Sequence, residues 1–122
     1  EAELLSGVKI EAEADVERAA DKLLATGLQQ VYISMGGDGV FAKNAAGETA
    51  RAACPHVTVA NATGGGDAMA AALAACITRG DPLRECARLA IGAGALACTS
   101  EETIHPGMSW ENIDYILNKE EL

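Results

Sequence analysis

The sequence has few aromatic residues and few basic ones. It contains one Trp, two Tyr and one Phe, and its nine Lys and Arg stand against eighteen Asp and Glu, for a formal net charge of -9. A nucleic-acid interface needs a basic face that neutralises phosphates, usually with aromatic side chains between the basic ones. The composition therefore argues against a nucleic-acid partner.

Long apolar runs are also missing. No stretch approaches the roughly 20 consecutive apolar residues that a membrane-spanning helix needs, and the first residues lack the basic and apolar regions of a signal peptide. We therefore expect a cytoplasmic protein that has no membrane partner.

Metal-binding and disulfide patterns are absent as well. None of the four cysteines lies in a CxxC spacing, and His56 and His105 have no ligand-spaced partners. Three of the cysteines lie in apolar, helix-like surroundings, so we expect reduced core thiols rather than disulfides or a zinc site. The cysteines are Cys54, Cys76, Cys86 and Cys98.

Residues 61–69, Asn-Ala-Thr-Gly-Gly-Gly-Asp-Ala-Met, form the most informative segment that is present. Glycine lets backbone N–H groups approach a ligand closely, and a helix N-terminus favours negative charge. A carboxylate at that position, Asp67, could accept a proton from a hydroxyl that attacks a phosphoryl group. The alternative is that Asp67 only caps the helix, a role that Thr63 could also fill.

Two common phosphate-binding motifs do not explain this segment. A P-loop places Lys and then Ser or Thr after its glycines, and here Asp67 follows instead. Neither glycine cluster gives the GxGxxG that opens a helix directly after a strand in dinucleotide-binding folds.

Hydrophobic periodicity and glycine or proline positions predict alternating helices and strands. The predicted helices span residues 13–26, 67–79, 82–99 and 109–119, with Ser109 as a cap; the predicted strands span 30–34, 40–42, 48–53 and 56–60. The helix at 13–26 leads into the strand at 30–34, which suggests a strand–crossover–strand unit. Residues 82–99 are expected to bury one face, and a glycine turn at 35–39 is expected to form a hairpin.

Residues 62–69 resemble the second signature of the ribokinase-like (PfkB) carbohydrate kinases, usually written Thr-Gly-Ala-Gly-Asp. Gly65 stands where alanine is commonest. The resemblance implies that Asp67 is the catalytic base, that Gly64, Gly65 and Gly66 form the anion hole, and that Thr63 belongs to the cofactor-binding residues. It also implies ATP and Mg²⁺ as cofactors.

A second correspondence lies at residues 30–39. This segment resembles the family's strand followed by Thr-Leu-Gly-x-x-Gly, whose hydroxyl and glycines approach the nucleotide phosphates. Ser34, Gly36 and Gly39 are the matching positions, with Gly37 as their neighbour. The alternative is that these glycines only make a tight turn.

Two positions correspond to metal sites of the family. The first residues resemble the end of its Asn-x-x-Glu motif, which makes Glu3 the carboxylate near magnesium, with Glu1 as the alternative in register. Asn61 stands where ribokinases usually carry the aspartate of a monovalent-cation site. The missing charge weakens such a site and puts potassium activation in doubt.

The resemblance implies an α/β fold, the ribokinase-like Rossmann-type three-layer sandwich, of which residues 1–122 would be the C-terminal portion only. Family members are much longer, and their N-terminal half supplies the sugar pocket and a lid. We therefore expect one nucleotide-binding and catalytic part of a larger sugar kinase, whose missing lid would allow a homodimer.

Two segments bear on the substrate. Residues 59–63 and the acidic loop at 99–103, Thr-Ser-Glu-Glu-Thr, resemble the pseudouridine kinase branch of the family. This implies ATP-dependent phosphorylation of a sugar or nucleoside hydroxyl, with the 5'-hydroxyl of pseudouridine as the expected acceptor and ribose or another carbohydrate or nucleoside as the alternative. A non-catalytic nucleotide-binding or regulatory module is the other interpretation, although the intact Asp67 argues against it.

Overall fold

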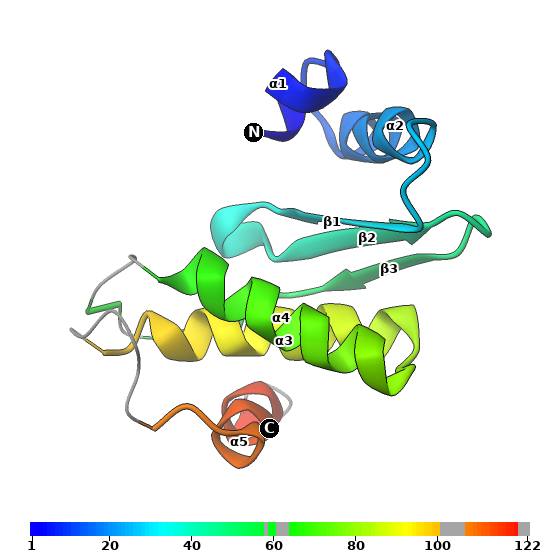
Figure 1. The fold of residues 1–122 in the computed structure, drawn as a ribbon. Helices are drawn as coiled ribbons and strands as arrows, with labels where there is room; N and C mark the ends of the chain where they lie inside the picture. The colour runs from blue at the N-terminus through cyan, green and yellow to red at the C-terminus, as the bar shows by residue number, and fades with distance from the viewer. Residues whose placement is uncertain (58, 61–63, 101–106, 120–122) are drawn as a thin grey trace.

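The computed structural model describes residues 1–57, 59–60, 64–100 and 107–119. It has three layers (Figure 1), with a small sheet between two groups of helices. Helix α4 packs on β2 and β3, whereas α2 packs on β1 and β2 from the other face; α3 and α5 pack on α4. The helices are α1 (Ala2–Ser6), α2 (Glu13–Leu24), α3 (Gly65–Arg79), α4 (Leu83–Ala97) and α5 (Trp110–Lys119).

The sheet is an antiparallel meander in the order β1-β2-β3. Its strands are β1 (Gln30–Ser34), β2 (Val40–Asn44) and β3 (Thr49–Ala52). A single 3-10 turn, η1 (Gly36–Asp38), connects β1 to β2, and the register pairs Ser34 with Val40. The hairpin predicted from the glycines at 35–39 is thus confirmed.

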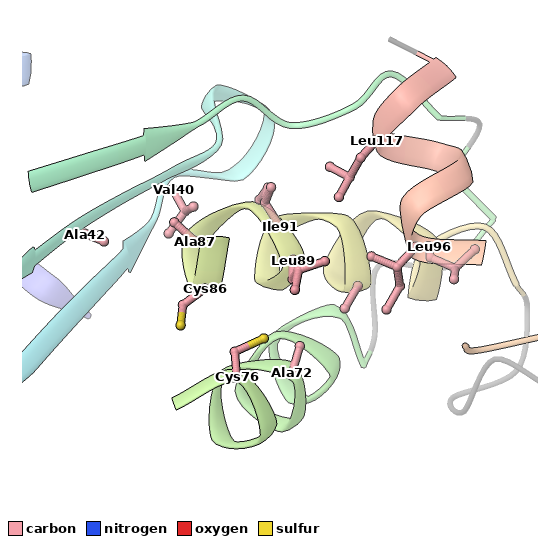
Figure 2. Packing of buried hydrophobic residues seen from close by; sticks show 12 residues of the cluster. Val40, Ala42, Ala72, Cys76, Cys86, Ala87, Leu89, Ile91, Leu96 and Leu117 are labelled. Atoms are coloured by element: carbon pink, nitrogen blue, oxygen red, sulfur yellow. The ribbon is translucent and has the colours of Figure 1, made fainter. Parts of the chain in front are cut away.

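Strand β2 divides its side chains between two cores, because successive residues of a strand point to opposite faces. Phe41 packs with Val31 and Ile33 of β1 and with the apolar stripe of α2. Val40 and Ala42 belong to the other core, which α4 dominates together with residues of α3 and α5 (Figure 2). The alternation of one short strand therefore joins the two helical layers.

Helix α4 differs from its prediction. We expected one buried face, but every residue from Leu89 to Ala97 is buried. Two glycines explain why neighbours can surround this helix. A Cβ at Gly92 would meet Leu117 of α5 at 2.8 Å, and one at Gly94 would meet Met69 of α3 at 2.7 Å. The two glycines thus let α5 and α3 approach α4 closely on two sides. The neighbours that they admit are far away in the sequence.

Several helix ends agree closely with the sequence. Gly80 ends α3 in the left-handed conformation, at φ 80°. The Ser109 hydroxyl accepts a hydrogen bond of 3.1 Å from the Asn112 backbone N–H, so the predicted cap of α5 is confirmed. Helix α3 begins at Gly65, two residues before the predicted start.

One prediction about strands is wrong for the part of the chain that the structure describes. Residues 56, 57, 59 and 60 form no strand, and the Ala60 N–H donates instead to the Cys98 carbonyl, 2.8 Å away at the end of α4. Among the described strands β1 pairs with β2 through a hairpin, and the crossover unit stays a prediction. Periodicity indicates extended backbone but does not supply the partner that a strand needs.

Two of the four cysteines are core thiols. The four cysteines form no disulfide, and Cys76 and Cys86 are fully buried between α3 and α4, whereas Cys54 and Cys98 are partly buried. Burial raises the pKa of the Cys76 thiol to about 11 and also raises the pKa of Cys86. Both groups are therefore protonated and weakly nucleophilic near neutral pH.

None of the described helices is long and apolar enough to cross a membrane.

Candidate active site

The N-terminus of α3 carries the candidate catalytic residues. Gly64 precedes the helix in the left-handed conformation, at φ 96°, and Gly65 and Gly66 are the first two helical residues. Asp67 is the third, in the first turn, and its side chain is exposed. The residue types of the Gly-Gly-Gly-Asp segment thus place a carboxylate beside the first backbone N–H groups of a long helix.

Among the residues that the structure describes, none supplies a capping side chain to this helix end. The first N–H groups of any α-helix lack intrahelical acceptors, and a side chain at the capping position often supplies one. Here Gly64 occupies that position, and no side-chain cap hydrogen bond is formed. Asp67 lies inside the helix, so the alternative that it serves as the cap does not fit this geometry. The N–H groups of the first helical turn and the helix dipole favour an anion at this position.

The two helical glycines differ in what surrounds them. A Cβ at Gly65 would lie 3.2 Å from the Cys98 sulfur, so Gly65 allows α3 to approach the end of α4. A Cβ at Gly66 would meet nothing within 4 Å, and Gly66 is exposed. Glycine is about 1 kcal/mol less favourable than alanine inside a helix. Packing therefore explains Gly65 but does not explain Gly66.

The turn between β1 and β2 carries the second group of candidate residues. Gly39 is buried with φ 94°, and a Cβ there would lie 2.1 Å from the Ala52 carbonyl oxygen of β3. Gly36 and Gly37 are exposed and face open space, and Ser34 is exposed at the end of β1. Figure 1 shows this turn and the start of α3 at the same end of the sheet. The fold thus brings together the two glycine-rich segments that the sequence separates.

An apolar cavity of about 420 Å³ lies beside this helix end. Its wall begins at Ala68, the residue after Asp67, and continues along the alanines of α3 to Ala93 of α4 and Trp110 of α5. The remaining lining residues are Ala71, Ala72, Met108, Ser109 and Ile113. A cavity of this size and apolar character can hold a small planar ring system. This cavity was not predicted from the sequence; the alanine-rich segment at 68–75 is the feature that could have indicated it, because small side chains leave space beside a helix.

Glu3 lies elsewhere in the structure. It is exposed in the first turn of α1, its carboxylate accepts a 2.8 Å hydrogen bond from the Ile10 N–H, and α1 is on the opposite face of the sheet from α3 (Figure 1). The described ranges contain no group of three or more His, Cys, Asp or Glu that could hold a metal ion. The assignment of Glu3 to magnesium therefore stays a prediction. Asn61 and Thr63 lie outside the described residues.

A three-layer α/β fold with an anion-favouring helix end and a glycine hairpin at one edge is typical of phosphate-handling enzymes. The model of the pfkB family carbohydrate kinases matches residues 1–111. The chain therefore belongs to the pfkB carbohydrate kinase family.

Two curated relatives agree with this assignment. The chain is 40% identical over 113 residues to the pseudouridine kinase of Escherichia coli (strain K12), an alignment that covers 93% of this chain and 36% of that protein. It is 38% identical over 109 residues to the bifunctional protein HldE of Trichlorobacter lovleyi, covering 87% of this chain and 22% of that one. The chain thus spans about a third or less of the length of these relatives.

Solved structures show the same fold. Phosphofructokinase-2 from Escherichia coli, in complex with potassium, superposes with a TM-score of 0.86 at 22% identity, covering 100% of this chain and 39% of that one. Ribokinase from Arabidopsis thaliana, complexed with ribose and ATP, gives a TM-score of 0.82 at 24% identity and covers 95% of this chain and 38% of that one. The expected ribokinase-like α/β fold is confirmed, as a portion of a larger fold.

Proposed function

We propose that residues 1–122 are the C-terminal nucleotide-binding and catalytic part of an ATP-dependent kinase that phosphorylates a sugar or nucleoside hydroxyl. The observation that carries this proposal is the exposed Asp67 in the first turn of α3, a helix that has glycine at its N-cap and no side-chain cap from the described residues. Membership of the pfkB carbohydrate kinase family supports the same chemistry.

In this proposal Asp67 accepts the proton of the acceptor hydroxyl as that oxygen attacks phosphorus. The N–H groups of Gly64, Gly65 and Gly66 donate to the phosphoryl oxygens, whose negative charge the N-terminal end of α3 stabilises. Removing one such donor from an anion hole typically costs about 2.7 to 4 kcal/mol of transition-state stabilisation. Binding of a phosphoryl group by these N–H groups requires no rearrangement of α3, because a Cβ at Gly66 would meet no atom within 4 Å and the space beside it is open.

ATP supplies the transferred phosphoryl group: the bond between its γ-phosphorus and the oxygen that bridges to the β-phosphate breaks as the new P–O bond forms, and ADP leaves. The phosphates of ATP contact Ser34, Gly36 and Gly37. These residues are exposed at the end of the sheet where α3 begins. Gly39 acts differently from its neighbours, because its missing Cβ lets the turn pack against β3. The apolar cavity beside Ala68 accommodates the base, and Thr63 belongs to the same group of cofactor-binding residues.

Mg²⁺ would accompany ATP and would neutralise negative charge on its phosphates when bound. The residues that the structure describes contain no group of three or more His, Cys, Asp or Glu that could hold a metal ion, and the assignment of Glu3 to magnesium stays a prediction from the sequence. The assignment of Asn61 to a monovalent-cation site also stays a prediction, and its neutral side chain weakens such a site for potassium.

We propose pseudouridine as the acceptor, through its 5'-hydroxyl, with ribose or another carbohydrate or nucleoside as the alternative. The 40% identity to a pseudouridine kinase supports this choice. The test is turnover of ATP by the full-length protein with pseudouridine, uridine, ribose and fructose 6-phosphate, with the products identified by mass spectrometry. We expect pseudouridine to have a kcat/KM at least about tenfold above the other acceptors. A higher value for any other acceptor would contradict the assignment.

The surface of the chain supports the proposal that it is part of a larger enzyme. Strand β1 pairs only with β2 among the described strands, and Leu4 and Leu5 of α1 are 87% and 73% exposed. Such exposed leucines beside a sheet edge suit a surface that another part of the protein covers. We expect residues 1–122 by themselves to show no phosphorylation of any acceptor. ATP binding by the full-length protein without turnover of any acceptor would favour the non-catalytic module instead.

A further inference from the structure

A second cavity, of about 360 Å³, lies between the end of β3 and the helices α4 and α5. The residues that line it include Arg51, Arg84, Arg88 and His56, and none of the described residues in its lining is acidic. The chain has a net charge of -9 and only nine Lys and Arg, so three of the nine line a single cavity. This concentration of positive charge favours a bound anion.

Two of these arginines already have partners. Arg51 pairs with Glu13 at 2.8 Å, and its guanidinium lies 4.8 Å from the centre of the Phe41 ring. Arg88 donates a 2.9 Å hydrogen bond to the Asn118 side chain and lies 3.4 Å from Glu85 and 3.7 Å from Asp114. Ion pairs of exposed or half-exposed side chains contribute about 0 to 1 kcal/mol, so an anionic ligand can replace them at little cost.

Arg84 has no ion pair among the residues that the structure describes. It is exposed, and it follows Pro82 at the beginning of α4. Its guanidinium therefore has all of its donors available.

The cavity is separate from the candidate active site. Arg84, Arg88 and Gly92 are spaced by four residues, so they lie on one stripe of α4. Gly92 contacts Leu117 of α5, which also lines the cavity, and Figure 2 shows Leu117 on α5 beside α4. Helix α3 approaches α4 at Gly94 instead. The arginine cavity thus lies on the α5 side of α4, away from the first turn of α3.

We propose that this cavity binds the phosphate group of a small phosphate ester. Guanidinium groups bind phosphate oxygens in pairs, through parallel N–H donors. The volume of about 360 Å³ lies within the range of small-molecule sites, which leaves room for an organic group beside the phosphate. Pro55, Ala53 and Leu117 supply apolar wall for that group. Ester binding in this cavity does not depend on the proposed kinase activity.

The test is isothermal titration of the full-length protein, with its nucleotide site saturated by a non-hydrolysable ATP analogue. The probes are glycerol 3-phosphate, ribose 5-phosphate, glucose 6-phosphate, inorganic phosphate and unphosphorylated glucose. We expect at least one ester to bind more tightly than inorganic phosphate, and glucose not to bind. Binding of no ester, or of inorganic phosphate alone, would overturn the proposal.

Substitutions locate the site and separate it from any sugar-phosphate pocket elsewhere. Arg84→Gln and Arg88→Gln should each weaken ester binding about tenfold, as expected for the loss of one charge-assisted hydrogen bond. Arg18→Gln is the matched control, because Arg18 is an exposed arginine of α2, paired with Asp15, on the other side of the sheet. Arg84→Gln removes no ion pair among described residues, so its fold should persist in a thermal melt. Unchanged ester binding in Arg84→Gln would refute the assignment whatever Arg88→Gln does.

Discussion

The two glycine-rich turns of this chain use the same residue type for different physical purposes. At residues 36–39 the buried Gly39 is required by the fold, because any Cβ would overlap the backbone of β3. At residues 64–66 Gly65 is limited by Cys98, whereas Gly66 faces open space in a helix where alanine would be more stable. Each turn therefore combines one glycine that packing explains with others that packing does not.

Within each turn, some glycines are confined by neighbouring atoms and others face open space where a ligand could approach. The two turns also differ in the element that each one leads into. The second turn leads into a 15-residue helix with an acidic first turn, whereas the first turn only returns the chain to the sheet. Both turns contain an exposed aspartate, Asp38 in one and Asp67 in the other. Matched substitutions in the two turns can therefore test this separation directly.

The largest effect is expected from Asp67→Asn in the full-length enzyme. Loss of a general base should lower kcat by about 10²- to 10⁴-fold. The exposed side chain contributes to stability only through the helix dipole, by less than about 1 kcal/mol. Steady-state kinetics and urea unfolding measure the two quantities. Asp38→Asn, the equivalent change in the other turn, should leave kcat unchanged; equal effects of the two substitutions would remove the distinction between the turns.

The next largest effect is a loss of stability in Gly39→Ala. The new Cβ would lie 2.1 Å from the Ala52 carbonyl oxygen, and φ 94° is unfavourable for any residue with a side chain. We expect the free energy of unfolding to fall by about 3 kcal/mol, measured by urea denaturation. An unchanged denaturation midpoint would show that the turn can move away from β3, and that Gly39 is not a structural glycine.

A smaller effect, with opposite directions for stability and activity, is expected from Gly66→Ala. Alanine should stabilise α3 by up to about 1 kcal/mol, since the position is helical and open. The methyl group should displace a bound phosphoryl group and lower kcat/KM on the order of tenfold. Thermal unfolding and kinetics of the same preparation test both. Higher stability with full activity would mean that no ligand approaches Gly66.

The smallest effect is expected from Gly37→Ala in the first turn. Its φ is not in the left-handed region and its surroundings are open, so stability should change by less than about 0.5 kcal/mol. If the turn contacts the nucleotide, the dissociation constant for ATP should rise about fivefold, the effect of one weakened hydrogen bond. Titration calorimetry with ATP measures this. Unchanged ATP affinity would leave this turn with a structural role alone.

The outcomes of the sequence predictions depend on the range of the interactions behind them. The strand at 30–34, the hairpin after it, the Gly80 helix end and the Ser109 cap are confirmed, because each depends on residues within a few positions. The strand at 56–60 is wrong, because pairing requires a partner strand that periodicity does not specify. The roles of Glu3, Asn61 and Thr63 remain predictions.

The candidate site divides in the same way. The glycine run, Asp67 and the turn at 35–39 were recognisable from residue types and spacing alone. Their position at one edge of the sheet, and the apolar cavity beside Ala68, could not be predicted, because they depend on how α3, α4 and α5 pack. The arginine cavity was missed for the same reason, since its arginines come from β3 and α4 and are dispersed in the sequence.

The sequence by itself determined where most helices and strands lie, which helix has glycines before its acidic first turn, and which family the residues resemble. These properties are local, because turns, caps and periodicity involve neighbouring residues. Only the tertiary structure decided that α4 is buried on all sides from Leu89 to Ala97, that Gly39 is confined by β3 whereas Gly66 faces open space, and where the two cavities lie. Those properties depend on contacts between distant residues, such as Gly92 with Leu117 and Gly94 with Met69.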